Sequence, residues 1–186
     1  MKIAVVGSYG VGMTMRIPQL PQAGETLMGG EFDAGPGGKG SNQAIGAARL
    51  GAEVSFLTAI GPDDFGQGAR VLWKDEGVDD SCVVTGKGHT MVGFILVEAD
   101  GENRIIVAAG ALDELTPKDV ENFRSHIAKA DVLVVSMELA FPAVLAALKI
   151  GREEGVFIVL NPTRLFQQLE QIIDDGGHLI EVIGFS

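Results

Sequence analysis

A glycine-rich segment leading into a predicted helix is the first place in this sequence where residue types and spacing suit chemistry. The segment runs Gly37, Gly38, Lys39, Gly40, Ser41, Asn42. Glycines let the backbone approach a ligand closely, and the first turn of a helix offers N–H donors that have no partner within the helix. Lys39 adds a cation, and Asn42 adds an amide that both donates and accepts hydrogen bonds. This inventory suits a polyhydroxylated ligand.

A purely structural interpretation of the same segment stays open. The helix that follows carries Ala44, Ala47 and Ala48, and small side chains let a helix lie close against a sheet. On these residues alone, the glycines serve either a ligand or that close packing.

Two nucleotide-binding motifs are excluded by spacing. Gly7, Gly10 and Gly12 follow the first apolar run in the wrong order for a dinucleotide-binding turn, and Pro18 and Pro21 stand where its helix would run.

A phosphate-binding P-loop fails as well. Gly40 separates Lys39 from Ser41, and Asp33 stands where the motif requires its first glycine.

The elements that must position the glycine-rich segment alternate along the chain. Apolar runs typical of buried strands occupy residues 3–6, 54–60, 132–135, 157–160 and 179–183. Helical patterns occupy residues 42–50, 65–76, 117–129, 141–154 and 165–175. Such alternation predicts an α/β fold with a parallel sheet and right-handed crossovers.

Two stretches, residues 13–33 and 83–108, break this alternation. The first is rich in proline and glycine, and the second contains two strand-like runs joined across Asp100-Gly101, a hairpin signal. We expect both stretches to form a small antiparallel sheet that stands off the main one. The predicted division is therefore a core of residues 1–12, 34–82 and 109–186, with the small sheet from residues 13–33 and 83–108.

Composition limits the partners. The net charge is -11 and no cluster of Lys or Arg stands out, which excludes nucleic acid as a partner. Cys82 is the only cysteine, so an internal disulfide and a cysteine-rich metal site are excluded, and a reducing cytosol is favoured. No apolar run is long enough for a signal peptide or a membrane span. We expect a cytoplasmic protein without a membrane partner.

The histidines give no sign of chemistry. His89, His126 and His178 are far apart in the sequence and show neither metal-ligand spacing nor a partnered carboxylate. No metal site is predicted.

The segment from Gly37 to Gly61 resembles the N-terminal signature of the ribokinase-like (PfkB) carbohydrate kinases. The likeness covers roughly residues 2–162 and includes Gly61-Pro62-Asp63-Asp64-Phe65-Gly66, the hairpin Gly101-Glu102-Asn103, and Glu138 after a strand. It implies a layered α/β sandwich with a β lid over the sugar and a homodimer formed through the lid. It also implies ATP and magnesium as cofactors, with phosphoryl transfer to a hydroxymethyl group of a sugar or nucleoside.

The resemblance also assigns residues by position. Gly38, Lys39, Gly40, Ser41 and Asn42 correspond to the loop that contacts the sugar. Glu138 corresponds to the acidic sugar contact at the carboxyl end of a strand, where open parallel sheets bind ligands.

The sequence departs from the family pattern in two ways. Gly10 and Gly12 stand where the family has Asn and Asp as sugar anchors. The Gly-Ala-Gly-Asp run that carries the family's catalytic base and anion hole is absent, and Asp174 and Asp175 precede their glycines in the reversed order. We therefore assign no catalytic residue, and we expect the C-terminal part of the family fold to be missing and ATP to bind poorly.

The sequence leaves three interpretations of the chain open. The chain is the sugar-binding loop and lid of a kinase without its catalytic half, or a non-catalytic sugar-binding or assembly protein, or a truncated, inactive gene product.

Overall fold

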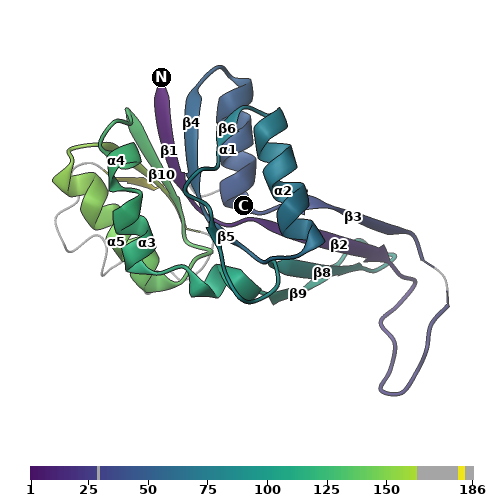
Figure 1. Cartoon of the computed structure of the whole chain (residues 1–186). Helices are drawn as coiled ribbons and strands as arrows, with labels where there is room; N and C mark the ends of the chain where they lie inside the picture. The colour runs from purple at the N-terminus through teal and green to yellow at the C-terminus, as the bar shows by residue number, and fades with distance from the viewer. Residues whose placement is uncertain (29, 163–179, 183–186) are drawn as a thin grey trace.

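A parallel sheet forms the centre of the structure, a computed structural model that describes residues 1–28, 30–162 and 180–182 (Figure 1). Among these residues the sheet has six strands in the order β12-β11-β10-β1-β4-β6, and each neighbouring pair is parallel. The strands are β1 (Lys2–Val6), β4 (Glu53–Leu57), β6 (Val78–Asp79), β10 (Val132–Ser136), β11 (Phe157–Asn161) and β12 (Ile180–Val182). The predicted parallel sheet is confirmed, including a strand near residue 180.

Helices cover both faces of this sheet (Figure 1). They are α1 (Lys39–Arg49) and α2 (Asp64–Asp75) on one face, and α3 (Pro117–Asn122), α4 (Arg124–Ile127) and α5 (Phe141–Glu153) on the other. Alternate side chains of β1 pack into the cores on the two faces of the sheet. Val5 belongs to the core cluster that contains Trp73 of α2. Ala4 and Val6 belong to the core cluster that contains Leu148 of α5. A strand buried on both faces is apolar throughout for this reason.

Two predicted elements are divided in the structure. The apolar run 54–60 breaks at Thr58, because β5 (Ala59–Ile60) leaves the main sheet to pair in parallel with β7 (Val84–Thr85). The helical pattern 117–129 breaks at Phe123, which ends α3 and precedes α4. Helix α1 also begins earlier than predicted, at Lys39.

A second, four-stranded sheet extends from the main one and is called the lid sheet below (Figure 1). Its order is β3-β2-β8-β9, with antiparallel pairs at both edges and a parallel central pair, β2 and β8. Its strands are β2 (Gly10–Arg16), β3 (Phe32–Gly37), β8 (Val92–Val97) and β9 (Asn103–Ala108).

The lid sheet differs in extent from the predicted stretches 13–33 and 83–108. Strands β2 and β3 lengthen the first stretch at both ends, because Gly10 pairs with Gly37. The second stretch begins later, because Val84 and Thr85 pair with β5 instead. The hairpin between β8 and β9 is as predicted, and Gly101 at its turn has a φ of +90° that favours glycine.

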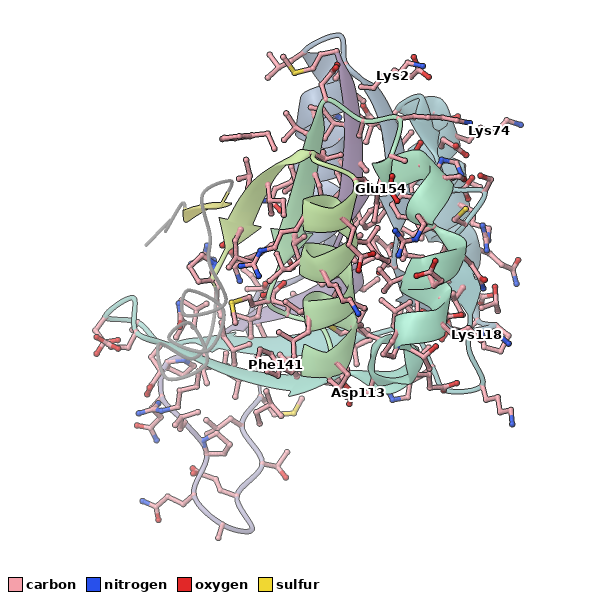
Figure 2. All side chains as sticks on the ribbon, turned by 90° about the vertical axis from the view of Figure 1, so that its left-hand side faces the viewer. Lys2, Lys74, Asp113, Lys118, Phe141 and Glu154 are labelled. Atoms are coloured by element: carbon pink, nitrogen blue, oxygen red, sulfur yellow. The ribbon has the colours of Figure 1, made fainter. Side chains whose placement is uncertain are left out.

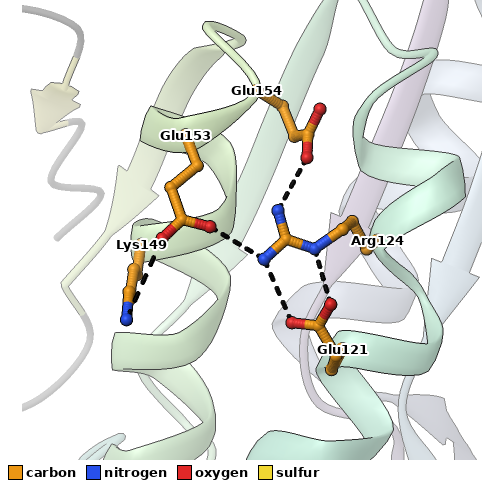
Figure 3. Close-up of polar contacts among 5 residues, drawn as sticks. All are labelled: Glu121, Arg124, Lys149, Glu153 and Glu154. Atoms are coloured by element: carbon orange, nitrogen blue, oxygen red, sulfur yellow. Dashed lines mark hydrogen bonds and ion pairs between the residues drawn. The ribbon is translucent and has the colours of Figure 1, made fainter.

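An ion-pair network joins the helices on the α5 face of the sheet (Figure 3). The Arg124 guanidinium contacts Glu121 Oε1 at 2.6 Å, Glu153 Oε2 at 2.8 Å and Glu154 Oε1 at 2.6 Å. Hydrogen bonds to these three carboxylates, led by Glu121, raise the pKa of Arg124. The network links the short α4 to α3 and to the end of α5.

Figure 2 labels Lys2 near the top of the view and Phe141 near the bottom, where the lid sheet lies. Lys2 opens β1, whereas Phe141 opens α5 just beyond the end of β10, so the carboxyl ends of the strands point toward the lid sheet.

Within the described residues, no helix is both long and apolar enough to cross a bilayer. The predicted helix 165–175 and its Asp174 and Asp175 lie outside the described residues.

Candidate functional site

Three polar side chains meet where the carboxyl ends of β1 and β10 lie side by side. Ser8 follows β1, Glu138 follows β10, and Lys39 opens α1. The Ser8 hydroxyl donates to Glu138 Oε2 at 2.5 Å, and the Lys39 ammonium donates to Glu138 Oε1 at 2.5 Å. The Lys39 N–H also donates to Glu138 Oε2 at 3.3 Å. Glu138 therefore ties two strands of the sheet to the start of a helix.

These contacts set the charge of the site. Burial alone would raise the pKa of Glu138, but hydrogen bonds from Lys39 and Ser8, together with the Lys39 charge, outweigh burial and lower it. Glu138 is thus an anion at neutral pH. Ser8 is fully buried, whereas the Lys39 and Glu138 side chains are 48% and 24% exposed. Both charged groups are accessible to a polar ligand.

Close backbone packing brings the helix to this place. A side chain at Gly40 would put its Cβ 2.5 Å from the carbonyl carbon of Gly7, and one at Gly38 would lie 2.7 Å from Ser8 O. Gly38 also has a φ of +92°, which disfavours other residues. The Ser41 N–H donates to Ser8 O at 2.9 Å. The glycines of the motif therefore let the backbone at the start of α1 pack directly against the end of β1.

The other predicted site residues point elsewhere. The buried Ser41 hydroxyl accepts a hydrogen bond from Trp73 Nε1 at 2.9 Å, so it belongs to the core beside α2. Asn42 lines a surface pocket of about 330 Å³ with residues of α1 and α2, including Arg49 and Leu72. Of the six residues assigned to sugar contact, the structure brings the Lys39 and Glu138 side chains together.

Ser8 is not among the site residues predicted from the sequence. A polar residue directly after a strand buried on both faces was the available signal, because ligands in open parallel sheets sit at the carboxyl ends of strands.

The two glycines on β2 differ in the space around them. A Cβ at Gly12 would meet Ile95 Cδ1 at 3.6 Å, an ordinary contact. A Cβ at Gly10 would lie 2.7 Å from the backbone oxygen of Met91. The structure therefore has room for a Cβ at position 12 but not at position 10.

Asp63 is a structural residue at the base of the lid sheet. It caps α2 by accepting from Gly66 N at 2.9 Å. It also accepts from Thr90 N at 2.7 Å and Thr90 Oγ1 at 2.6 Å. Thr90 Oγ1 in turn accepts from Gly61 N at 3.0 Å. Asp63 thereby fixes the segment that enters β8.

The expectation that no histidine has a carboxylate partner is wrong for His126. Its Nδ1 lies 3.8 Å from Asp79 Oδ2, because the fold brings α4 against β4 and β6 from distant parts of the sequence. His89 Nδ1 contacts Thr90 O at 2.8 Å, and His178 lies outside the described residues. Among the described residues, no group of His, Cys, Asp and Glu has the arrangement of a metal site.

Comparisons with known proteins agree with this architecture. Residues 2–179 match the model of the pfkB family carbohydrate kinases. The chain is 38% identical to a ribokinase of Staphylococcus aureus, covering 87% of this chain and 54% of that protein. It is 35% identical to a ribokinase of Haemophilus influenzae, covering 92% and 58%.

A solved structure is similar over nearly the whole chain. The structure of ribokinase from Giardia lamblia has a TM-score of 0.85 and 25% identity, covering 98% of this chain and 56% of that one. The chain thus spans little more than half the length of the relatives it matches. Over that length its sequence and fold agree with theirs, and the chain belongs to the pfkB family of carbohydrate kinases.

Proposed function

We propose that this chain forms the sugar-binding part of an ATP-dependent carbohydrate kinase. The reaction is phosphoryl transfer from ATP, with magnesium, to a hydroxymethyl group of a sugar or nucleoside. The observation that carries the proposal is the meeting of Lys39 and Glu138 beside the start of α1, at the carboxyl edge of the parallel sheet. Membership of the family supplies the reaction class.

The site has hydrogen-bonding capacity for a sugar. A carboxylate oxygen has two lone pairs, and Glu138 Oε1 accepts one hydrogen bond from Lys39. The Lys39 ammonium has three donors, of which this bond uses one. A pair of neighbouring hydroxyl groups, each a donor and an acceptor, would bridge the ammonium and the carboxylate. Because both groups are charged, these hydrogen bonds are stronger than those between neutral groups.

Glycine at position 12 lowers the affinity that we expect for a sugar. The resemblance places an acidic sugar anchor at this position, and glycine supplies no such group. We therefore expect weak binding by the natural chain. The Cβ that Gly12→Asp adds meets Ile95 only at an ordinary contact distance, and an added charged hydrogen bond contributes about 1.5 to 3 kcal/mol, or roughly tenfold or more in affinity.

Titration calorimetry with a panel of pentoses, hexoses and nucleosides tests the proposal. Glu138→Gln and Lys39→Met should each abolish measurable binding, and Gly12→Asp should strengthen it. Glu53→Gln is the matched control, because Glu53 opens β4 at the opposite edge of the sheet and pairs only loosely with Lys2 at 3.6 Å. Binding that survives both Glu138→Gln and Lys39→Met would refute the proposed site.

We expect binding without turnover from these 186 residues alone. Phosphoryl transfer requires a base for the hydroxyl proton and donors for the phosphoryl oxygens. The resemblance places these groups in the Gly-Ala-Gly-Asp run, which this sequence does not contain. A coupled kinase assay showing turnover above the no-enzyme control, and loss of that turnover in Glu138→Gln, would contradict this expectation.

We also propose that the chain forms a homodimer through the lid sheet. Phe94 is 51% exposed and Ile106 is 70% exposed, and the two residues are register partners on one face of β8 and β9. Met15 and Phe32 pair on the same face of β2 and β3 and are also exposed. A continuous apolar face of this kind favours burial against a second copy.

A further inference from the structure

A thiol, an imidazole and a carboxylate line up on the side of the sheet remote from the sugar site. Cys82 Sγ lies 3.4 Å from His126 Nε2. The other ring nitrogen, His126 Nδ1, lies 3.1 Å from Ser55 Oγ and 3.8 Å from Asp79 Oδ2. Cys82 follows β6, His126 lies in α4, and Ser55 and Asp79 are register partners on β4 and β6.

One arrangement of protons satisfies all of these contacts. The Ser55 hydroxyl donates to Asp79 Oδ2 at 3.4 Å, so its oxygen is left to accept from His126 Nδ1–H. With its proton on Nδ1, the neutral ring presents the Nε2 lone pair to the Cys82 thiol. His126 is then placed as a base toward the sulfur.

The imidazole and the carboxylate are both held in place. The Phe123 ring stacks on His126 with centroids 4.9 Å apart and planes 9° apart. The Ser81 N–H donates to Asp79 Oδ1 at 3.0 Å. Burial would raise the pKa of Asp79, but hydrogen bonds from Ser81 and Ser55 and the nearby His126 lower it. Asp79 is therefore an anion beside the His126 ring.

The segment that carries the thiol is also fixed. Arg70 pairs with Asp80 at 2.8 Å and donates to Val83 O at 3.1 Å, so it holds the residues on both sides of Cys82. Cys82 itself is half-buried. This arrangement holds the sulfur close to the imidazole.

A surface pocket of about 230 Å³ opens beside the cluster and is lined by Ser55, Asp79 and His126. Lys2, Glu53 and Lys129 are the other charged residues of its lining. The pocket gives the imidazole and carboxylate end of the cluster a solvent-accessible side with charges of both signs. Such a lining suits a small polar molecule.

We propose that Cys82 is a site of thiol–disulfide exchange with small polar disulfides of the glutathione type. The Cys82 thiol gives its proton to His126 Nε2, and the sulfur attacks one sulfur of the disulfide. A new S–S bond forms as the old one breaks, and the departing thiolate takes up a proton to leave as a free thiol. The products are the mixed disulfide at Cys82 and one equivalent of small thiol, so oxidation states balance.

Intact-mass kinetics test this proposal directly, because Cys82 is the only cysteine and every adduct reports on it. The folded chain is mixed with oxidised glutathione near pH 7, and the rate of the single adduct is measured. We expect His126→Asn to slow the reaction by about tenfold or more, because positioned bases contribute at least this much. His89→Asn is the matched control, since His89 contacts Thr90 rather than the thiol.

Equal rates in the natural chain, His126→Asn and His89→Asn would overturn the proposal. So would a rate in the natural folded chain no faster than that of the urea-unfolded chain. Circular dichroism of each variant shows that the comparison is made between folded proteins.

The pH profile separates base catalysis from simple access to the sulfur. An unassisted thiol loses about tenfold in thiolate for each pH unit below its pKa. The ratio of the natural rate to the His126→Asn rate should therefore grow as the pH falls from about 8.5 to about 7. Asp79→Asn should reduce this growth, because the ring loses its anionic partner. A ratio that stays constant with pH would show that His126 merely shapes access, and would overturn the proposed role.

Discussion

The Lys39 ammonium nitrogen lies 2.5 Å from Glu138 Oε1, although the two residues are 99 positions apart in the sequence. The contact joins the glycine-rich start of α1 to the loop after β10, and the Ser8 hydroxyl completes it from the end of β1. Three segments thus place one cation and one anion at the edge of the sheet that faces the lid.

Ser8→Ala should weaken both the fold and the site. The substitution removes the buried donor to the Glu138 carboxylate, and a hydrogen bond to a charged group contributes about 1.5 to 3 kcal/mol to the free energy of unfolding. Urea denaturation measures this loss. Ser125→Ala on the exposed side of α4 is the control and should change stability by less than about 0.5 kcal/mol. Equal stability of the two variants would show that the Ser8 contact adds nothing.

Two glycines of the same helix should respond oppositely to alanine. At Gly40 the new Cβ would collide with the backbone of Gly7, so Gly40→Ala should destabilise the chain by about 1 to 3 kcal/mol. At Gly46 no atom lies within 4 Å of the new Cβ, and Gly46→Ala should stabilise by about 0.5 to 1 kcal/mol through helix propensity. Thermal unfolding of both variants checks the difference in sign; a stable Gly40→Ala variant would contradict the close packing of α1 on β1.

Asp63 should make the fold sensitive to acid. Burial would raise the pKa of Asp63, but hydrogen bonds from Thr90 and Gly66, with the nearby His89, lower it below its usual value. A carboxyl whose pKa is depressed by folding stabilises the folded state above its unfolded pKa, and this stability is lost as the pH falls through the folded value. The free energy of unfolding should therefore drop on acidification below about pH 4. Asp63→Asn should be less stable at pH 7 and should lose less on acidification; parallel pH profiles for the two proteins would contradict this role.

The lid sheet should mediate association. Light scattering of the natural chain should give the mass of a dimer at high concentration, and Ile106→Asp should shift it toward the monomer, because the charge would be buried in the proposed interface. Val71→Asp is the control, since Val71 is 60% exposed on α2 and lies outside the lid sheet. A natural chain that stays monomeric at high concentration would rule out the dimer.

Much of the fold could be predicted because its signals are local. Apolar runs such as residues 132–135 and the capping residue Thr116 before Pro117 specify a buried strand and a helix start within a few positions. The break at Thr58 could not be predicted in this way, since residues 54–60 are a continuous strand-like run. The break arises because the Val84 N–H donates a hydrogen bond to Thr58 O, and these two residues are distant in the sequence.

The candidate site could be predicted only in part for the same reason. Lys39 could be singled out from the glycine-rich segment itself, whereas Glu138 could be singled out only through the resemblance to a family, and the structure brings them together. The roles of Ser8, of Ser41 toward Trp73 and of His126 beside Cys82 depend on pairings between residues 32 to 130 positions apart. Neither spacing nor composition encodes those pairings.

The proposed site requires that Lys39 and Glu138 bind a sugar, with the Glu138 carboxylate held in place by the buried Ser8 hydroxyl. Nuclear magnetic resonance of the labelled chain, recorded while sugars and nucleosides are titrated, tests it most directly. Binding should shift the backbone signals of Ser8 and of residues 38–40 and the side-chain carboxyl signal of Glu138, with saturation near or above the millimolar range expected without an anchor at Gly12. Saturable shifts confined to other parts of the chain, or no shift with any ligand of the panel, would contradict the account.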